Sequence, residues 1–473
     1  MKPSRDRSHR NRPGLFSRLN YLLFWWVADG FTLAALFASF HAYRQGGVPR
    51  FWPLEAFLIS YCFCAAALYV AGGYSSRTGK LSLEYSTVHL ASLFLALPLI
   101  LCVVYVFTAY ADTFKPSRGA LIPAIATFAP LSLVFRRLIE QRVRGTYQPP
   151  PIAILGATDD LRSLWHELFE REREEGGKYR FFSLDGAPMG PLTGPESPRV
   201  EAWNSVLLES RGRDFASIVL ASPAAVLPTP LRRALSQAHL DGLRVYSAEA
   251  FAESVFGKVL LREVDDEWIL DREINLAQSA SYFRLKKIID RILATGLLLL
   301  FLPVILLVSL LILVLDGRPV FYLQNRYGLR GGVFALYKFR TMRQRPKEGS
   351  LYTSEGDERL TVLGKILRPF RLDELPQLWN VLAGDMSLIG PRAEWVRCVE
   401  RYEEEIPYYH LRHEVPPGLT GWAQVNFPYG SGVEDAREKL RYDLYYIRNH
   451  SFLMDFQIVL KTVYVVLTKA GGK

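Results

Sequence analysis

The chain has 473 residues, enough for two or three domains, and 49% of them are hydrophobic. Its net charge of +10 is typical of a nucleic-acid binder or of a protein beside an anionic membrane surface. Because the apolar residues are concentrated in long runs, we expect a membrane partner and no nucleic acid. The four cysteines have neither the spacing of a disulfide framework nor that of a metal site.

Four apolar segments in the first 140 residues are predicted to span a membrane; they are 21–40, 51–71, 88–109 and 119–135. The basic N-terminal tail and the arginine-rich segment after the fourth span place both ends on the cytoplasmic side. No cleavage site follows the first span, which predicts a retained anchor. For Asp29 and Glu55, helix-to-helix hydrogen bonding or an interfacial position is favoured over a functional role. We therefore expect residues 1–140 to form a four-helix transmembrane bundle.

Residues 150–265 alternate between strand and helix patterns. The strands are expected within 150–156 and at 180–184, 216–221 and 243–246, and the helices near 159–170 and 229–240. This order predicts a small α/β parallel-sheet (Rossmann-like) cytosolic domain. Gly156 supplies one glycine where a dinucleotide fingerprint needs three, so a structural or regulatory role is expected rather than cofactor binding.

The segment 292–315 has 24 residues without a charge and Pro303 at its midpoint. A proline inside a helix removes a hydrogen bond and bends it. Each limb would measure about 18 Å, which reaches the middle of a hydrocarbon core of about 30 Å. Basic residues flank both ends, whereas a crossing helix should be asymmetric; they are Arg284, Lys286, Lys287 and Arg291 before, and Arg318, Arg326 and Arg330 after. A re-entrant membrane helix over 282–316 is therefore favoured over a fifth crossing.

A β-hairpin is predicted beyond that helix, from two apolar runs around the turn NRYGLRG. Its aromatic residues are interpreted as one buried face: Phe321, Tyr322, Phe334, Tyr337 and Phe339. Seven positive charges and no acid occur between residues 326 and 347; they are Arg326, Arg330, Lys338, Arg340, Arg343, Arg345 and Lys347. With the aromatics buried, this basic run does not indicate single-stranded nucleic-acid binding.

The segment 367–394 carries the chemistry. A helix is predicted here from apolar residues at helical spacing, with Gly384 as a candidate C-cap; the apolar residues are Leu375, Leu378, Trp379 and Leu382. This helix would have Asp373 and Glu374 at its N-terminus and Pro376 in its first turn. Alone, such acids would be read as a helix cap. Their surroundings favour a diphosphate site at a membrane surface, because Arg368, Arg371 and Arg392 bracket them and the loop 416–426 is rich in Pro and Gly. One carboxylate could attack phosphorus and its neighbour could hold Mg²⁺.

Three segments carry a family resemblance: YLQNRYGLRGGVFALYKFRTM, LDELPQLWNVLAGDMSLIGPR and PPGLTGWAQVN. They resemble the catalytic domain of bacterial sugar transferases, polyprenyl-phosphate phosphoglycosyl transferases of the monotopic superfamily, over about 285–470. With the four preceding spans, the chain resembles the long, exopolysaccharide-associated form of that family. The resemblance implies a mainly helical α+β catalytic domain over 317–473. Its apolar tail 452–468 is interrupted by Asp455 and Lys461 and is expected to be an interfacial helix.

The resemblance also implies residue roles. Asp373 would be the nucleophile on the β-phosphorus of a UDP-sugar, releasing UMP, and Glu374 would bind Mg²⁺. Undecaprenyl phosphate would then accept the phosphosugar and give an undecaprenyl-diphosphate sugar. The phosphates would be held by Lys338, Arg340, Arg368 and Arg392. Implied partners are membrane lipid and other polysaccharide-assembly proteins, at the cytoplasmic face of a bacterial inner membrane; the sugar and the oligomeric state stay open.

Departures from the family pattern occur at three positions. Leu302 stands before the kink proline where Ser is usual, Pro416 precedes Pro417-Gly418 where a basic residue is common, and Arg371 stands where a smaller residue is usual. His410 and His413 lie three apart, but without a third ligand structural or surface roles are favoured over metal binding. Two alternatives stay open: a non-catalytic membrane scaffold in which Asp373 and Glu374 are only a cap, and an NAD-dependent enzyme built on the α/β domain.

Overall fold

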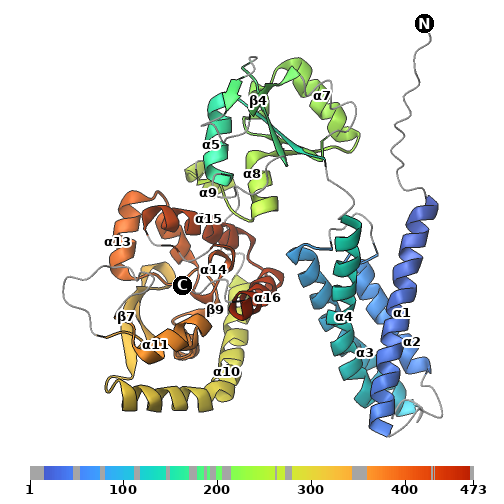
Figure 1. Cartoon of the computed structure of the whole chain (residues 1–473), viewed down its shortest axis with the longest axis vertical. Coiled ribbons are helices and arrows are strands. Elements are labelled where there is room, and N and C mark those ends of the chain that lie inside the picture. Colours follow the sequence, from blue (N-terminus) through green and yellow to red (C-terminus); the bar gives the residue numbers. More distant parts are fainter. Residues whose placement is uncertain are drawn as a thin grey trace. The chain divides into compact units, whose positions relative to one another are not determined.

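The computed structural model describes residues 15–45, 54–74, 80–110, 118–144, 150–169, 178–185, 189–191, 199–204, 215–261, 264–271, 280–343, 359–427, 430 and 432–468. Arg345 and Lys347 of the predicted basic run lie outside this set. The chain divides into two compact units, Met1–Gln148 and Pro149–Lys473, each described by itself below (Figure 1).

The first unit is helical, as predicted. Its helices are α1 (Leu15–Gln45), α2 (Leu54–Val70), α3 (Leu83–Tyr110) and α4 (Arg118–Arg144). A shared apolar core with residues from all four helices includes Trp25, Leu68, Ile100 and Phe128. Three of these helices are long and apolar enough to cross a membrane, but α2, with 17 residues, is shorter. Among the described residues, the fourth helix that meets both criteria is α10 (Ala280–Leu315), in the second unit.

A buried ion pair joins the first and last helices of this unit. The Arg136 guanidinium donates to both carboxylate oxygens of Asp29, at 2.8 and 2.6 Å, and lies 4.6 Å from the centre of the Trp25 ring. Both side chains are at least 96% buried. The predicted helix-to-helix hydrogen bonding of Asp29 is therefore confirmed, and its charge is compensated as a membrane interior requires. Glu55 is exposed in the first turn of α2.

The second unit begins with a six-stranded sheet in the order β3-β4-β2-β1-β5-β6. The strands are β1 (Ile152–Gly156), β2 (Tyr179–Ser183), β3 (Met189–Pro191), β4 (Arg199–Ala202), β5 (Ser217–Leu220) and β6 (Arg244–Ser247). All neighbouring pairs are parallel except β3–β4. Strand β1 is apolar throughout because both faces are covered: Ile154 belongs to one core cluster, and Ala153 and Leu155 belong to another. The predicted parallel-sheet region is confirmed, whereas β3 and β4 were not predicted.

Helices α5 (Thr158–Leu168) and α7 (Thr229–Leu240) flank this sheet close to where they were expected (Figure 1). The N-terminus of α5 is occupied by the Asp185 carboxylate, which accepts hydrogen bonds from the Thr158 amide at 3.1 Å and its hydroxyl at 2.5 Å. In dinucleotide-binding folds the pyrophosphate lies at this helix end. The placement of Asp185 is a physical argument against the NAD alternative.

The remaining elements form the region that carries the motifs. After α9 (Asp266–Asp271) and α10 come the hairpin β7 (Phe321–Tyr327) and β8 (Val333–Phe339), then α11 (Val362–Leu367), α12 (Gln377–Ala383), β9 (Ser387–Ile389), α13 (Val396–Glu405), β10 (Gly418–Thr420), α14 (Trp422–Asn426), α15 (Val433–Asn449) and α16 (Phe452–Thr468). The predicted hairpin is confirmed, with Phe321 opposite Phe339 and Tyr327 opposite Val333.

Helix α10 bends, and Figure 1 shows it changing direction within its length. Pro303 lies inside it. Ala294 belongs to the same core cluster as Leu336 of β8, whereas Ile312 belongs to another cluster with Phe339 of the same strand. A straight helix would separate Ala294 from Ile312 by about 27 Å. Since Leu336 and Phe339 are only about 10 Å apart along a strand, the two clusters fit a bent helix better than a straight one.

Two expectations about this region need correction. Lys286 was counted as a basic flank of the membrane helix, but it is 4% exposed and forms an ion pair with Asp455 of α16 at 2.7 Å. In the hairpin, Phe339 is buried, but Phe321 and Tyr322 are exposed by 41% and 48%. The prediction of one buried aromatic face is wrong for these two residues, because a two-stranded hairpin has no further strand to cover β7.

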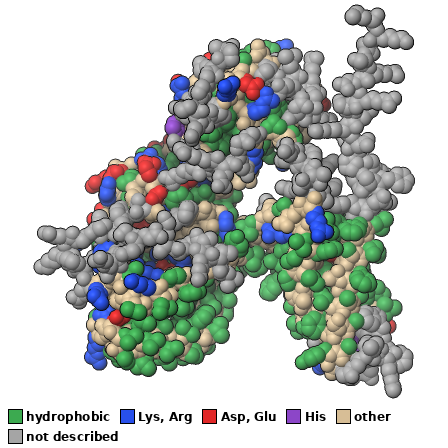
Figure 2. All heavy atoms as spheres, viewed as in Figure 1, with side chains coloured by type: hydrophobic (Ala, Val, Ile, Leu, Met, Phe, Trp, Pro, Cys, Tyr) green, Lys and Arg blue, Asp and Glu red, His purple; other side chains and the backbone are tan. Residues whose placement is uncertain are grey.

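Exposed apolar side chains continue from β7 onto the outer surface of α10, including Leu306, Leu310 and Val314. Figure 2 shows hydrophobic side chains gathered over this end of the second unit. A contiguous apolar surface of this kind marks a site of membrane or protein contact.

Candidate active site

The acid pair lies in a tight turn that precedes α12 rather than at the N-terminus of that helix. Two 3-10 turns, Arg368–Phe370 and Leu372–Glu374, are joined by Arg371, whose φ of 53° is in the left-handed region. Pro376 is the residue that precedes α12, and no side chain caps either element. Gly384 ends α12 with a φ of 91°, as predicted. Asp373 and Glu374 therefore do not act as helix caps, which removes the simplest non-functional reading.

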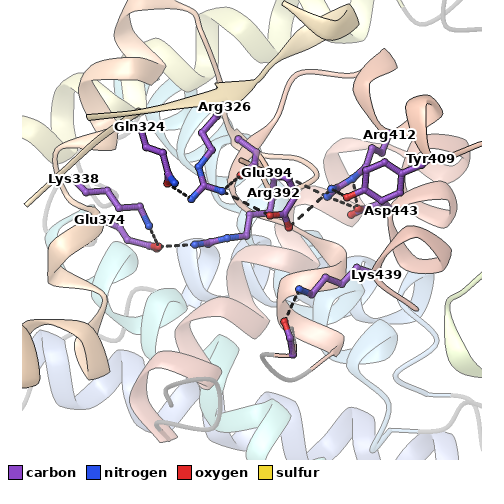
Figure 3. A network of polar contacts seen from close by, with 12 residues as sticks. Gln324, Arg326, Lys338, Glu374, Arg392, Glu394, Tyr409, Arg412, Lys439 and Asp443 are labelled. Atoms are coloured by element: carbon purple, nitrogen blue, oxygen red, sulfur yellow. Dashed lines mark hydrogen bonds and ion pairs between the residues drawn. The ribbon is translucent and has the colours of Figure 1, made fainter. Parts of the chain in front are cut away.

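Glu374 is surrounded by cations from three segments. Its Oε1 accepts from Lys338 Nζ of β8 at 2.9 Å and from Arg392 Nη2 at 3.2 Å (Figure 3). Its Oε2 lies 3.5 Å from Arg371 Nη1. Burial by itself would raise the pKa of Glu374, but Lys338, Arg392 and Arg371 hold that pKa well below its usual range. Glu374 is therefore held in its ionised form.

Asp373 has a different environment although it is the next residue. It is 8% exposed, and its carboxylate makes no side-chain hydrogen bond with the described residues. Burial and the negative charge of Glu374 raise the pKa of Asp373, against the opposing charges of Lys338, Arg368 and Arg392. Adjacent carboxyls whose environments push their pKa values apart are typical of sites in which the two have different roles.

The position of Lys338 depends on Asn380, which the sequence interpretation missed. Asn380 is fully buried on α12; its Nδ2 donates to Ala335 O at 2.8 Å and its Oδ1 accepts from Tyr337 N at 3.0 Å. Asn380 thus binds the Ala335 carbonyl and the Tyr337 amide of β8, which lie just before Lys338 in the chain. The signal that could have found it is the occurrence of amide side chains, Gln377 and Asn380, in an otherwise apolar helix.

The loop that carries Arg392 is fixed by close contact between two glycine-containing segments. Strands β9 and β10 pair in parallel, and Arg392 forms an isolated bridge with Gly418. A Cβ atom on Gly390, Gly418 or Gly421 would come within 3.0 Å of backbone atoms of the facing segment. These glycines are required by close approach rather than by positive φ, which explains why the loop 416–426 is so rich in glycine.

The other predicted phosphate-binding residues have different surroundings. Arg368 donates from Nε to Thr341 Oγ1 at 3.0 Å and is near enough to Asp373 to lower its pKa. Arg340 instead donates to the carbonyls of Asp316, Gly317 and Arg318, at 2.6, 2.7 and 2.8 Å, at the C-terminal end of α10. The structure therefore brings Lys338, Arg368 and Arg392 to the acid pair, whereas Arg340 forms hydrogen bonds just beyond the end of α10.

The two histidines, His410 and His413, differ in their exposure. His413 is 8% exposed and packs on Tyr327 and Tyr409, whereas His410 is exposed. Among the described residues, no group of three or more His, Cys, Asp or Glu side chains is arranged to hold a metal ion. The structural interpretation of His413 agrees with its packing.

Residues 281–469 match the family of bacterial sugar transferases. The chain is 39% identical over 242 residues to the UDP-N-acetylgalactosamine-undecaprenyl-phosphate N-acetylgalactosaminephosphotransferase of Aeromonas hydrophila, which covers 51% of this chain and 56% of that protein. It is 39% identical over 203 residues to the UDP-glucose:undecaprenyl-phosphate glucose-1-phosphate transferase of Xanthomonas campestris pv. campestris, covering 41% of this chain and 42% of the relative. The chain thus spans about half the length of these two curated relatives.

A shorter relative is matched nearly in full. The exopolysaccharide production protein PSS of Rhizobium leguminosarum bv. phaseoli is 40% identical over 195 residues, which are 98% of its length and 40% of this chain. The chain belongs to the bacterial sugar transferase family.

The close approach at Gly421 gives a first prediction. Replacing Gly421 by Ala should lower the stability of purified protein by about 1–3 kcal/mol, because the added methyl overlaps backbone atoms of Gly390. Thermal unfolding in detergent measures this. The matched control is Gly296→Ala in α10, where a Cβ meets nothing within 4 Å; equal unfolding temperatures for the two variants would contradict the backbone-contact explanation.

Proposed function

We propose that this protein transfers a sugar 1-phosphate from a UDP-sugar to undecaprenyl phosphate, giving an undecaprenyl-diphosphate sugar and UMP. The observation that carries the proposal is the buried acid pair in which Glu374 is held by Lys338, Arg371 and Arg392 while Asp373 is left without a hydrogen bond partner among the described side chains. Membership of the bacterial sugar transferase family and the activities in the names of the relatives support this proposal. The product would start the repeat unit of an exopolysaccharide or related glycan, in company with other assembly proteins.

The first half-reaction is nucleophilic. An ionised Asp373 oxygen attacks the β-phosphorus of the UDP-sugar, and the bond from that phosphorus to the oxygen bridging the α-phosphate breaks. The electron pair leaves on UMP, and the sugar phosphate becomes an acyl phosphate on Asp373. The raised pKa of Asp373 suits this role, since the carboxylate of a weaker acid is the better nucleophile once it is ionised.

In the second half-reaction a phosphate oxygen of undecaprenyl phosphate attacks the same phosphorus. The phosphorus–oxygen bond to Asp373 breaks, which frees the carboxylate and gives the lipid diphosphate sugar. Lys338, Arg368 and Arg392 are proposed to hold the phosphates and to offset the charge that develops on their oxygens. Arg340 keeps its predicted phosphate role as a hypothesis, beside its hydrogen bonds to the end of α10.

Mg²⁺ is the proposed cofactor, and the donor set fits it. In phosphate-transfer sites Mg²⁺ is commonly held by one or two carboxylates together with substrate oxygens and water. Glu374 supplies such a carboxylate through its Oε2 atom, which lies 3.5 Å from Nη1 of the partly exposed Arg371. Bound there, the ion would neutralise the diphosphate. The residues of the chain bring the two carboxylates side by side and keep Glu374 ionised.

The bent helix α10 is proposed to be re-entrant. Its outward apolar side chains and those of β7 would lie in the lipid, with the acid pair at the depth of a lipid phosphate. Helices α1 to α4 would cross the bacterial inner membrane and leave the active site on the cytoplasmic face, where UDP-sugars are found. The transferred sugar is not assigned, since the relatives named above carry the names of N-acetylgalactosamine and glucose.

Replacement of the nucleophile tests the reaction. Asp373→Asn should reduce UMP release from UDP-sugars by several orders of magnitude, since an amide cannot form the acyl phosphate. A second measurement uses a UDP-sugar labelled at the β-phosphate, with no lipid acceptor added. The wild-type protein in its membranes should then retain the label, whereas the Asp373→Asn protein should not. Full turnover by the variant would contradict the assignment of Asp373 as the nucleophile.

The pH dependence of kcat/KM gives a second test. Only the ionised Asp373 attacks, so kcat/KM should fall as the pH drops below the raised pKa of that carboxyl. Lys338 lowers this pKa; Lys338→Gln should therefore move the acid limb to higher pH. The control is Arg401→Gln, which removes an exposed arginine paired with Glu405 on α13 and should leave the limb in place. A shift to lower pH in the Lys338 variant would contradict the assignment.

Membrane topology tests the re-entrant helix. Reporter fusions placed after residue 330 and at the C-terminus should both report the cytoplasm, because α10 enters and leaves on one side. A periplasmic signal at either position would show that α10 crosses the membrane.

A further inference from the structure

The loop that presents Arg392 has little secondary structure of its own, so its position must be supplied by neighbours. Residues 392–394 follow β9 and precede α13, outside both elements. Their three carbonyls are each held: Arg392 O accepts from Arg412 Nη2 at 3.0 Å, Ala393 O from Arg326 Nη1 at 3.0 Å, and Glu394 O from Tyr327 N at 3.2 Å. Two arginines and one backbone amide therefore fix the loop.

Arg412 is the more deeply buried of these arginines, with 3% exposure. Besides Arg392 O, its guanidinium contacts Asp443 Oδ2 of α15, from Nε at 3.0 Å and from Nη2 at 2.8 Å. It also donates from Nη1 to the Tyr409 hydroxyl at 2.5 Å. Figure 3 shows Arg412 lying between Tyr409 and Asp443 on one side and the Arg392 loop on the other.

A buried ion pair is weak evidence for stability, because apolar residues of similar volume often stabilise a core as well or better. What apolar residues cannot do is donate a directed hydrogen bond to the Arg392 carbonyl. The charge of the network is offset locally, since Glu394 lies 3.7 Å from Arg326 and 4.0 Å from Arg412. Arg412 can therefore stay charged while its guanidinium donates to the main-chain carbonyl of Arg392. The side chain of Arg392 in turn donates to Glu374.

We propose that Arg412, neutralised by Asp443, is a positioning residue that holds the main chain of Arg392 and thereby sets the Arg392 guanidinium against Glu374 and the donor phosphate. The proposal rests on the proposed function, because the readout is turnover of a UDP-sugar. It adds a residue outside the acid pair and its phosphate-binding cations. Small misplacements of a phosphate-binding group lower rates by about 100-fold, which sets the size of the effect.

The test separates positioning from stability with a paired variant. Arg412→Met alone leaves the Asp443 charge buried and unpaired and should unfold at a lower temperature. Arg412→Met combined with Asp443→Leu removes both charges and should recover the unfolding temperature. If Arg412 positions Arg392, the double variant should still show kcat/KM for UMP release reduced roughly 10- to 100-fold. Wild-type kcat/KM in a stable double variant would overturn the proposal.

Coupling to Arg392 supplies the readout that a purely structural role would not move. In an Arg392→Ala background the Arg412/Asp443 double variant should cause no further loss, because the group it positions is gone. Additive losses would contradict the proposal. Arg441→Met is the matched control: Arg441 is a buried arginine of α15 that pairs with Glu167 and Glu438, and its effect on kcat/KM should be the same with and without Arg392.

Hydrogen exchange keeps the inference testable apart from the function. Backbone amides of residues 390–396 should exchange faster in the double variant than in wild type, and unchanged protection would overturn the proposal. If wild-type protein releases no UMP from any UDP-sugar, the proposed function fails, whereas this exchange experiment still decides whether Arg412 holds the loop.

Discussion

The charge of Glu374 is the constraint on which the transferase region depends. A carboxylate that is 8% exposed can stay ionised only if cations reach it, and removal of one partner from such a cluster leaves a costly unpaired charge. The cations come from three segments that are distant in sequence: Lys338 from β8, Arg371 from the turn itself, and Arg392 from the loop after β9. One buried charge therefore ties the hairpin, the acid-pair turn and the loop together. Asp373 beside it keeps its carboxylate available.

Strand β8 links this charge cluster to helix α10. Lys338 belongs to this strand, and Arg340 directly follows its last residue. Lys338 bonds Glu374, and Arg340 bonds three carbonyls at the end of α10. Leu336 and Phe339 of the same strand belong to the two core clusters that also include Ala294 and Ile312 of α10. Strand β8 and the residue that follows it therefore contact both the acid pair and the end of α10.

Patterns that depend on local burial could be predicted from the sequence. Strands such as Ile152–Gly156 are apolar because both faces are covered, and the hairpin 321–339 is marked by its turn. Short strands such as Met189–Pro191 have too few residues to show a period. The turn at the acid pair was placed in the wrong element, because nothing in the sequence indicates that Arg371, a non-glycine residue, adopts a left-handed conformation.

Long-range contacts account for the rest of what the sequence could not show. The alternation of aromatic residues along the hairpin predicted an aromatic face but could not show what covers that face. Phe321 and Tyr322 were therefore expected to be buried, and they are exposed. Arg340 was recognised as basic, but its carbonyl partners lie more than 20 residues away. The same holds for Arg412 and Asp443, which meet across 31 residues. A charged residue in a basic or acidic run has no local feature that distinguishes a phosphate contact from a structural one.

Helix α15 also explains how the α/β domain is attached to the transferase region. Glu438 and Arg441 of α15 pair with Lys258 and Glu167 at 2.8 and 2.7 Å, and the Trp422 indole of α14 donates to Gly257 O at 2.7 Å. These contacts are largely buried, so the surfaces cannot separate without leaving charges unpaired. Two residues beyond Arg441, Asp443 holds Arg412. Helix α15 thus carries two separate sets of contacts, those that hold the α/β domain and the one that supports Arg412.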